Sequence, residues 1–194
     1  HRTIEGQAIE LGWRSDNVVD LTPTDYLDMV LLKTCSYSTI FPLRIGGLIG
    51  SWGTADLDAL TRFGFHLGAA FQIRDDLLNL VGNSDHYGKE ILGDLYEGKR
   101  TLMILHLLSV ASEPEQVWLN AFLFAGRSER SESEVRAVLG LMKDHGSIEF
   151  AREFSRGVSA AAREAFEVAF RGLPPSDDLH FIEELIPYML EREL

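Results

Sequence analysis

The residues best suited to chemistry in this sequence are two adjacent carboxylates, Asp75 and Asp76, and the nearby amide of Asn79. Asp75 and Asn79 are four residues apart, so on an α-helix they share one face and lie about 6 Å apart along its axis. Gln72 precedes them by one turn. Oxygen ligands without histidine or cysteine suit a hard cation such as Mg²⁺, which keeps several waters and takes further oxygens from phosphate groups. The spacing therefore indicates a metal site that also binds an anionic group.

An aspartate pair near a helix end is usually no more than a solvated surface feature, so the segment that follows it matters. That segment contains two Gly-Lys pairs, Gly88-Lys89 and Gly98-Lys99. Ammonium groups on a flexible loop beside carboxylates are able to hold anionic oxygens. The combination favours a binding site over a plain surface.

The second of these pairs also has the glycine spacing of a nucleotide-binding P-loop, because Gly93 precedes Gly98-Lys99 by five residues. Arg100, however, occupies the position at which a P-loop has its metal-binding Ser or Thr, and no predicted strand precedes the loop. We therefore reject a nucleotide-binding loop.

Composition narrows the class of protein further. The 194 residues include 18 Lys and Arg against 30 Asp and Glu, a formal net charge of -12, which argues against a nucleic-acid partner. An acidic protein still binds diphosphates when a divalent metal supplies the intervening positive charge. The single Cys35 forms no internal disulfide, and no apolar run approaches the roughly 20 residues that span a bilayer. We expect a cytoplasmic protein without a membrane span, with Cys35 packed rather than reactive.

One long helix is predicted over Leu57–Val81, ending at Gly82-Asn83-Ser84. It carries the aspartate pair near its end. Gly64, Gly68 and Gln72 are spaced by four residues and so share one face of this helix. We expect the two glycines to leave room for a groove beside it.

Helical signals extend over the rest of the sequence, and strand signals are almost absent. Further helices are predicted, in chain order, after the capping residues Thr22-Pro23-Thr24-Asp25, over Thr101–Val110, from Pro114 to Phe124, after the capping box Ser131–Glu134, over Ile148–Phe170, and from Asp177 to Leu194 with a bend at Pro187. The apolar face of the Ala-rich helix is predicted to comprise Phe150, Phe154, Val158, Ala161, Ala165 and Ala169. With no repeat or linker, residues 1–194 are expected to form one all-α domain.

A set of motifs over about the first 110 residues resembles the trans-isoprenyl diphosphate synthase (polyprenyl synthetase) family. The most specific part is its second aspartate-rich region: Phe71-Gln72-x-x-Asp75-Asp76, then Gly88-Lys89, Gly93-x-Asp94 and Gly98-Lys99-x-Thr101. Two helices agree as well, one with Gly6-Gln7 and Glu10 and one with Tyr26-Leu27 and Lys33-Thr34.

The resemblance implies an isoprenoid-synthase-type helical bundle that is partial here, because the family's N-terminal helices and first aspartate-rich motif lie before the region of similarity. It implies a Mg²⁺-dependent homodimer that condenses isopentenyl diphosphate with an allylic diphosphate to a geranyl-, farnesyl- or geranylgeranyl-type product. In this family, product length is set largely by residues preceding that first motif. This chain alone is expected to hold too few metal ligands for turnover.

The resemblance also implies roles for individual residues. The expected catalytic residues are Lys33, Thr34 and Gln72, the expected substrate-binding residues are Lys33, Phe71, Gln72, Lys89 and Lys99, and the expected metal ligands are Asp75, Asp76 and Asn79. Asp75 would be the principal ligand, with Asp76 and Asn79 acting mainly through metal-bound water.

Departures from the family pattern leave two other functions open. Asn79 replaces the third Asp of the motif, Cys35 stands where Gly often follows Lys-Thr, and Met103 stands where Pro is common. Together with the absent first motif, Asn79 is compatible with a non-catalytic regulatory subunit of a prenyl synthase. A terpene cyclase of the same fold is the other alternative, although the Gly-Lys-x-Thr pattern favours the chain-elongating branch.

Overall fold

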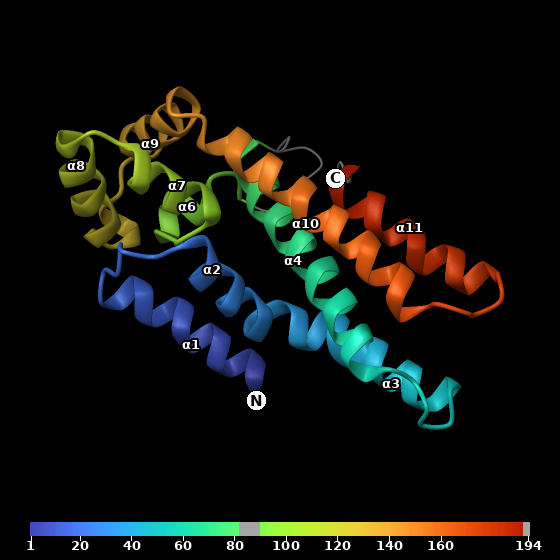
Figure 1. Ribbon diagram of the computed structural model, residues 1–194. Coiled ribbons are helices and arrows are strands. Elements are labelled where there is room, and N and C mark those ends of the chain that lie inside the picture. Colours follow the sequence, from blue (N-terminus) through green and yellow to red (C-terminus); the bar gives the residue numbers. More distant parts are fainter. Residues whose placement is uncertain (82–89, 192–194) are drawn as a thin grey trace. The chain divides into compact units, whose positions relative to one another are not determined.

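The computed structural model describes residues 1–81 and 90–191, with side chains up to residue 189 (Figure 1). Within these ranges the regular elements are helices, and no strand is present. Their bounds are α1 Arg2–Ser15, α2 Pro23–Val30, η1 Leu31–Ile40, α3 Phe41–Gly50, α4 Leu57–Val81, α6 Gly93–Glu97, α7 Leu102–Val110, α8 Glu113–Phe124, η2 Arg127–Glu129, α9 Glu132–Asp144, α10 Ser147–Ala169 and α11 Asp177–Glu191. The all-α prediction is confirmed.

The long helix predicted over Leu57–Val81 is present with those bounds as α4. Gly82-Asn83-Ser84, the Gly88-Lys89 pair and Leu194 lie outside the described residues. None of the described helices is long and apolar enough to cross a membrane.

The chain divides into two compact units whose boundaries fall inside helices. Among the described residues, the first unit comprises 1–6, 30–74 and 154–191, and the second comprises 7–29, 75–81 and 90–153. Helix α4 therefore contributes its first 18 residues to one unit and its end, from Asp75, to the other.

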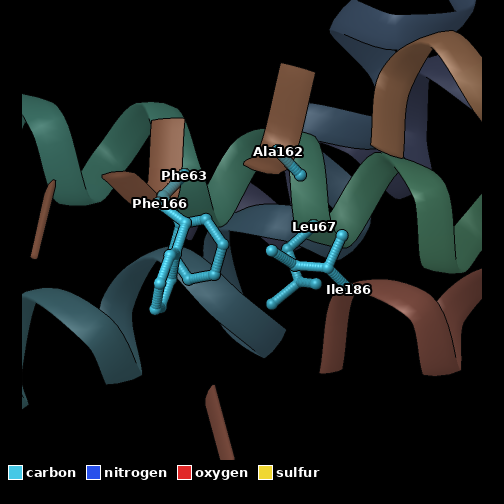
Figure 2. Packing of buried hydrophobic residues seen from close by; sticks show 5 residues of the cluster. All are labelled: Phe63, Leu67, Ala162, Phe166 and Ile186. Carbon is cyan, nitrogen blue, oxygen red and sulfur yellow. The ribbon is translucent and has the colours of Figure 1, made fainter. Parts of the chain in front are cut away.

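The first unit is held by an aromatic core between α4, α10 and α11. Phe63 and Leu67 of α4 pack against Ala162 and Phe166 of α10 and Ile186 of α11 (Figure 2). The rings of Phe63 and Phe166 meet edge to face, with centroids 5.6 Å apart. Such pairs add about 1 kcal/mol to the free energy gained by burying their apolar area. This core fixes the first part of α4.

The buried face of α10 is shifted from the predicted one. The predicted row is only half-buried, whereas the fully buried positions in the first unit are Ser155, Ser159, Ala162 and Phe166. The hydroxyls of Ser155 and Ser159 make no hydrogen bond in the part of the chain that the structure describes. Two serines at the centre of the face explain the error, because a hydropathy pattern assigns serine to solvent.

Helix α2 begins where the sequence predicts. The Asp25 carboxylate accepts hydrogen bonds from the backbone N–H of Thr22 at 2.8 Å and from its hydroxyl at 2.6 Å, and the N–H of Asp25 donates back to Thr22 Oγ1 at 3.2 Å. This capping box satisfies donors that the first turn of a helix leaves unpaired.

Helix α2 continues into η1, a ten-residue stretch of π-helix, and then into α3. The N–H of Phe41 donates to the carbonyl of Ser36, five residues earlier, and Pro42 follows directly. Inside a helix, a proline ring collides with the carbonyl four residues before it, and wider turns relieve that collision. A helix is predicted here from the sequence, but its π-helical pitch is not. Lys33 and Thr34 both lie in this π-helical segment.

Glycines on α4 bring it into close contact with η1. Thr39 Oγ1 donates a hydrogen bond to the carbonyl of Gly64 at 2.5 Å. A Cβ atom at Gly68 would lie 2.8 Å from Cys35 Sγ and 3.1 Å from Cys35 Cα. The groove expected beside Gly64 and Gly68 is therefore filled by η1, and that expectation was wrong. Glycine there permits helix packing rather than ligand access.

The second unit contains α7, the helix predicted over Thr101–Val110, whose buried residues are Leu102, Met103, Ile104, Leu105 and Leu107. Helix α9 begins with the predicted capping box, in which the N–H of Glu134 donates to Ser131 Oγ.

Candidate active site

Asp76, near the end of α4, is buried and hydrogen-bonded across the second unit. The phenol of Tyr26 on α2 donates to Asp76 Oδ2 at 2.8 Å. Asp76 is 6% exposed and Tyr26 is 1% exposed. A neutral donor stabilises a buried carboxylate and fixes its orientation. Asp75 beside it is half-buried. Sequence reasoning identified both aspartates but gave Tyr26 no part in the site.

Asn79 is buried one turn after Asp75 and contacts the segment that returns to the end of α4. Its Oδ1 accepts the N–H of Asp94 at 3.0 Å, and its Nδ2 donates to the carbonyl of Glu90 at 3.1 Å. Its own carbonyl accepts the N–H of Leu92 at 2.8 Å. The expected role as a water-mediated metal ligand stays a prediction.

Lys99 and Asp94 form a partly buried ion pair beside the aspartates, with 2.5 Å between Nζ and Oδ1. Desolvation raises the pKa of Asp94, and the negative charges of Asp75 and Glu10 add to the increase, while Lys99 opposes it. Desolvation by itself would lower the pKa of Lys99, but the hydrogen bond and charge of Asp94, with the charges of Glu10 and Asp76, raise it instead.

The negative charges of Glu10 and Asp75 thus act on Asp94, and those of Glu10 and Asp76 act on Lys99. We call Glu10, Asp75, Asp76 and Asp94, together with Lys99, the carboxylate cluster of the second unit. Sequence reasoning selected the two adjacent aspartates and Lys99 as site residues. Asp94 and Glu10 lie in the motifs that carry the family resemblance, but the resemblance gave them no role. Their position in those motifs was the signal that could have identified them.

Two buried arginines hold the turn that carries Lys99. Arg100 donates to the carbonyl of Gly98 at 2.5 Å, to Asn17 Oδ1 at 2.6 Å and to the carbonyl of Val18 at 3.1 Å. Arg130 donates to the carbonyl of Tyr96 at 2.6 Å. Desolvation lowers the pKa of Arg100 to about 10, so the guanidinium remains charged at neutral pH.

Gly98 is required in this turn for two reasons. Its φ of +64° is in the left-handed region, and a Cβ atom there would lie 2.8 Å from Cζ of Arg130. The Gly-Lys motif thus positions Lys99 through backbone geometry and arginine contacts rather than through flexibility.

The expected catalytic residues Lys33, Thr34 and Gln72, and the expected substrate-binding residue Phe71, belong to the first unit. Thr34 Oγ1 donates to Gln72 Oε1 at 2.8 Å, which links η1 to α4 and fixes the orientation of the amide. Lys33 lies where α1 passes close to η1, since a Cβ atom at Gly6 would lie 2.8 Å from Lys33 Cβ.

Cys35 has no exposed surface, and burial raises the pKa of its thiol to about 12. A thiol with this pKa is protonated at neutral pH and unreactive. The expectation that Cys35 is packed is confirmed.

The donor set is compatible with a hard cation, although it does not make a closed metal site. Among residues 1–81 and 90–191, no group of three or more His, Cys, Asp or Glu side chains is arranged to hold a metal ion. Asp75 and Asp76 offer carboxylate oxygens alone. That set fits an ion such as Mg²⁺, which is commonly bound by one or two carboxylates, water and substrate phosphates.

An Asp-Asp pair near the end of a long helix, with a lysine paired to a buried aspartate in the same unit, agrees with the resemblance drawn from the motifs. The chain matches the family model of polyprenyl synthetase over residues 1–142, and it belongs to that family. The resemblance stated from the motifs is confirmed.

Relatives and solved structures agree with this assignment. The chain is 32% identical over 188 residues to a geranylfarnesyl diphosphate synthase of Natronomonas pharaonis, covering 97% of this chain and 51% of the relative. A decaprenyl diphosphate synthase from Rhodobacter capsulatus is 27% identical with a TM-score of 0.83, covering 100% of this chain and 57% of that one. A polyprenyl synthase from Caulobacter crescentus, solved with calcium and isoprenyl diphosphate, is 25% identical with a TM-score of 0.85, covering 100% of this chain and 56% of that one. The chain thus spans about half the length of the relatives it matches.

Proposed function

We propose that this chain is the diphosphate-binding part of a prenyltransferase that condenses isopentenyl diphosphate with an allylic diphosphate. The observation that carries the proposal is the Asp75-Asp76 pair at the end of α4, where Tyr26 holds Asp76 and the Asp94–Lys99 ion pair lies in the same unit. Support comes from family membership and from a relative of the same fold that was solved with a divalent cation and isoprenyl diphosphate.

In the proposed reaction, the C–O bond of the allylic diphosphate breaks and diphosphate leaves with the electron pair. The double bond of isopentenyl diphosphate then attacks the allylic carbocation, which moves the positive charge to the isopentenyl unit. Loss of a proton from that unit forms a new double bond. Mg²⁺ bound at the site would supply the positive charge that stabilises the leaving diphosphate. The protein has to hold the diphosphate and keep water from the carbocation.

In the second unit, Asp75 and Asp76 are the proposed ligands for that cation. Tyr26 orients Asp76. Lys99, which is paired with Asp94 and so offsets part of the cluster's negative charge, stays a proposed substrate-binding residue. Asn79 stays a proposed water-mediated ligand. In the first unit, Lys33 is the proposed diphosphate-binding cation.

Three further assignments complete the proposal. Thr34 and Gln72, which are hydrogen-bonded to each other, would face the reacting carbon. Phe71 would provide an apolar wall that tolerates a carbocation. Lys89, which lies outside the described residues, would bind the allylic diphosphate.

A homodimer is also proposed, and it is supported by one exposed apolar stripe in the first unit. Tyr37, Phe41, Ile45 and Ile49 recur every four residues along η1 and α3, and each is at least 48% exposed. A row of this kind is typical of a helix that packs against a partner. Light scattering should give twice the monomer mass, and Ile45→Glu should reduce it to the monomer mass.

The test of the activity is isopentenyl transfer by the full-length protein that contains this chain. Asp75→Ala should lower kcat/KM by at least about 100-fold, because a ligand of the cation that would stabilise the leaving diphosphate is lost. Asp178→Ala, at an exposed position near the start of α11, is the matched control and should retain activity. Unchanged turnover in Asp75→Ala would refute the assignment.

The second candidate, a non-catalytic subunit of a prenyl synthase, is favoured by the lack of a closed metal cluster among the described residues. It predicts no transfer by the full-length protein alone and transfer only after addition of an active synthase. A third candidate is a terpene cyclase of the same fold. Omitting isopentenyl diphosphate from the assay distinguishes it, since a cyclase forms product without that substrate.

A further inference from the structure

Helix α6 begins at a residue that is unable to cap it. Its N-cap position is Leu92, which has the left-handed backbone angles φ 63° and ψ 9° and makes no side-chain cap hydrogen bond. Bulky non-glycine residues adopt this conformation only when neighbouring contacts hold it. Ser, Thr, Asp or Asn would normally accept a backbone N–H of the first turn. The local sequence therefore leaves α6 without its usual start.

Asn79 supplies the missing contacts from α4. The N–H groups of Leu95 and Tyr96 donate to the carbonyl of Leu92, whereas the N–H of Asp94 donates to Asn79 Oδ1 at 3.0 Å. The carbonyl of Asn79 accepts the N–H of Leu92 at 2.8 Å, which holds the left-handed residue in place.

The amide of Asn79 performs a task that a carboxylate at the same position would not. Its Nδ2 donates to the carbonyl of Glu90 at 3.1 Å while its Oδ1 accepts from Asp94. An aspartate at position 79 would still accept the N–H of Asp94, but its second oxygen would face the carbonyl of Glu90 with no proton between them. It would also add a negative charge beside Asp75.

We propose that Asn79 is a positioning residue that caps α6 from α4 and so holds the Asp94–Lys99 ion pair in the carboxylate cluster, whether or not a metal is bound. Relative to the motif's third Asp, Asn79 keeps the acceptor for the Asp94 N–H and gains a donor to the carbonyl of Glu90, so the replacement is more than the loss of a ligand. The clamp itself does not depend on the proposed function. Its consequence for catalysis, the placement of Lys99, does.

The test is amide hydrogen exchange by NMR on the full chain in buffer without divalent metal or substrate. Asn79→Ala should accelerate exchange at the Asp94 amide by about tenfold, because one buried hydrogen bond contributes about that factor. Asn79→Asp should restore slow exchange at Asp94, since a carboxylate accepts the same N–H. The Lys99 side-chain resonance should move in Asn79→Ala and return towards its wild-type position in Asn79→Asp.

Asn120→Ala is the matched control, because Asn120 is in the same unit and its Oδ1 has no hydrogen-bond partner in the described structure. It should leave exchange at Asp94 unchanged.

The proposal is overturned if Asn79→Ala leaves the exchange rate of the Asp94 amide at its wild-type value or if Asn79→Asp fails to restore slow exchange. Should Asn79→Ala not fold, slow exchange at Asp94 in folded Asn79→Asp still supports the clamp, and fast exchange there overturns it. A protein without prenyl transfer activity would leave this result unaffected.

Discussion

The phenol of Tyr26 donates a hydrogen bond to the carboxylate of Asp76, which is 50 residues later in the chain. Both side chains are buried, so the hydrogen bond fixes one of the two adjacent aspartates in a single orientation. The relationship connects α2 with the end of α4 inside the second unit. It implies that stability and the geometry of the site depend on the same contact.

Tyr26→Phe should lower the free energy of unfolding by about 1–3 kcal/mol, because Asp76 loses its donor while the aromatic packing is kept. Urea denaturation measures the change. Tyr188→Phe is the control, since Tyr188 is 53% exposed on α11 and lies outside the site and the proposed dimer stripe, and it should have little effect. Equal unfolding midpoints for Tyr26→Phe and the wild type would contradict the role given to this contact.

Lys99→Met should lower the free energy of unfolding by about 2 kcal/mol, because Asp94 is left in a desolvated position without its cation. Adding Asp94→Asn should recover part of that loss, since the unpaired charge is then removed. A double-mutant cycle in urea measures the coupling. Strictly additive losses would mean that the two groups do not interact.

Gly68→Ala should destabilise the protein by about 1–3 kcal/mol, because the new methyl group would overlap Cys35 on η1. Gly140→Ala is a matched control inside α9, where an added Cβ meets no atom within 4 Å. That substitution should stabilise the protein by up to about 1 kcal/mol through helix propensity. Thermal melts of the two variants should therefore shift in opposite directions, and a shift in the same direction would count against the packing of η1 on α4.

The start of α8 should make stability depend on acid pH. Hydrogen bonds from Ser112, aided by His145, lower the pKa of Glu115 from 4.5 to about 2. A carboxyl group whose pKa is depressed in the folded state stabilises the fold above pH 4.5, and this contribution is lost as the pH falls from 4.5 towards 2. Glu115→Gln should flatten the decline of unfolding free energy over this interval, as measured by urea denaturation at each pH. Glu113→Gln, in the same turn, should leave the decline as steep as in the wild type.

Local signals explain why most elements were predictable. The end of α4 follows from the Gly82-Asn83-Ser84 stop signal, and the starts of α2 and α9 follow from capping residues whose hydrogen bonds are made within four residues. The aspartates were identifiable for the same reason, because their spacing is a property of one helix.

The features that sequence reasoning missed depend on contacts between distant segments. Tyr26 contacts Asp76 only when α2 packs beside the end of α4. The amide of Asn79 has partners only when the chain brings Glu90 and Asp94 back to α4. The interpretation of Gly68 failed similarly, because a glycine row predicts space beside a helix without saying whether another helix fills it.

The central claim is that carboxylates at the end of α4 bind a diphosphate through a shared divalent cation, and calorimetric titration of the full-length protein with inorganic diphosphate tests it most directly. The wild type should bind diphosphate in the presence of Mg²⁺ and lose that binding in excess chelator. Asp75→Asn, which keeps the side-chain shape but removes the charge, should weaken binding by at least about tenfold. Equal affinity in the wild type and Asp75→Asn, or binding that is indifferent to Mg²⁺, would contradict the account.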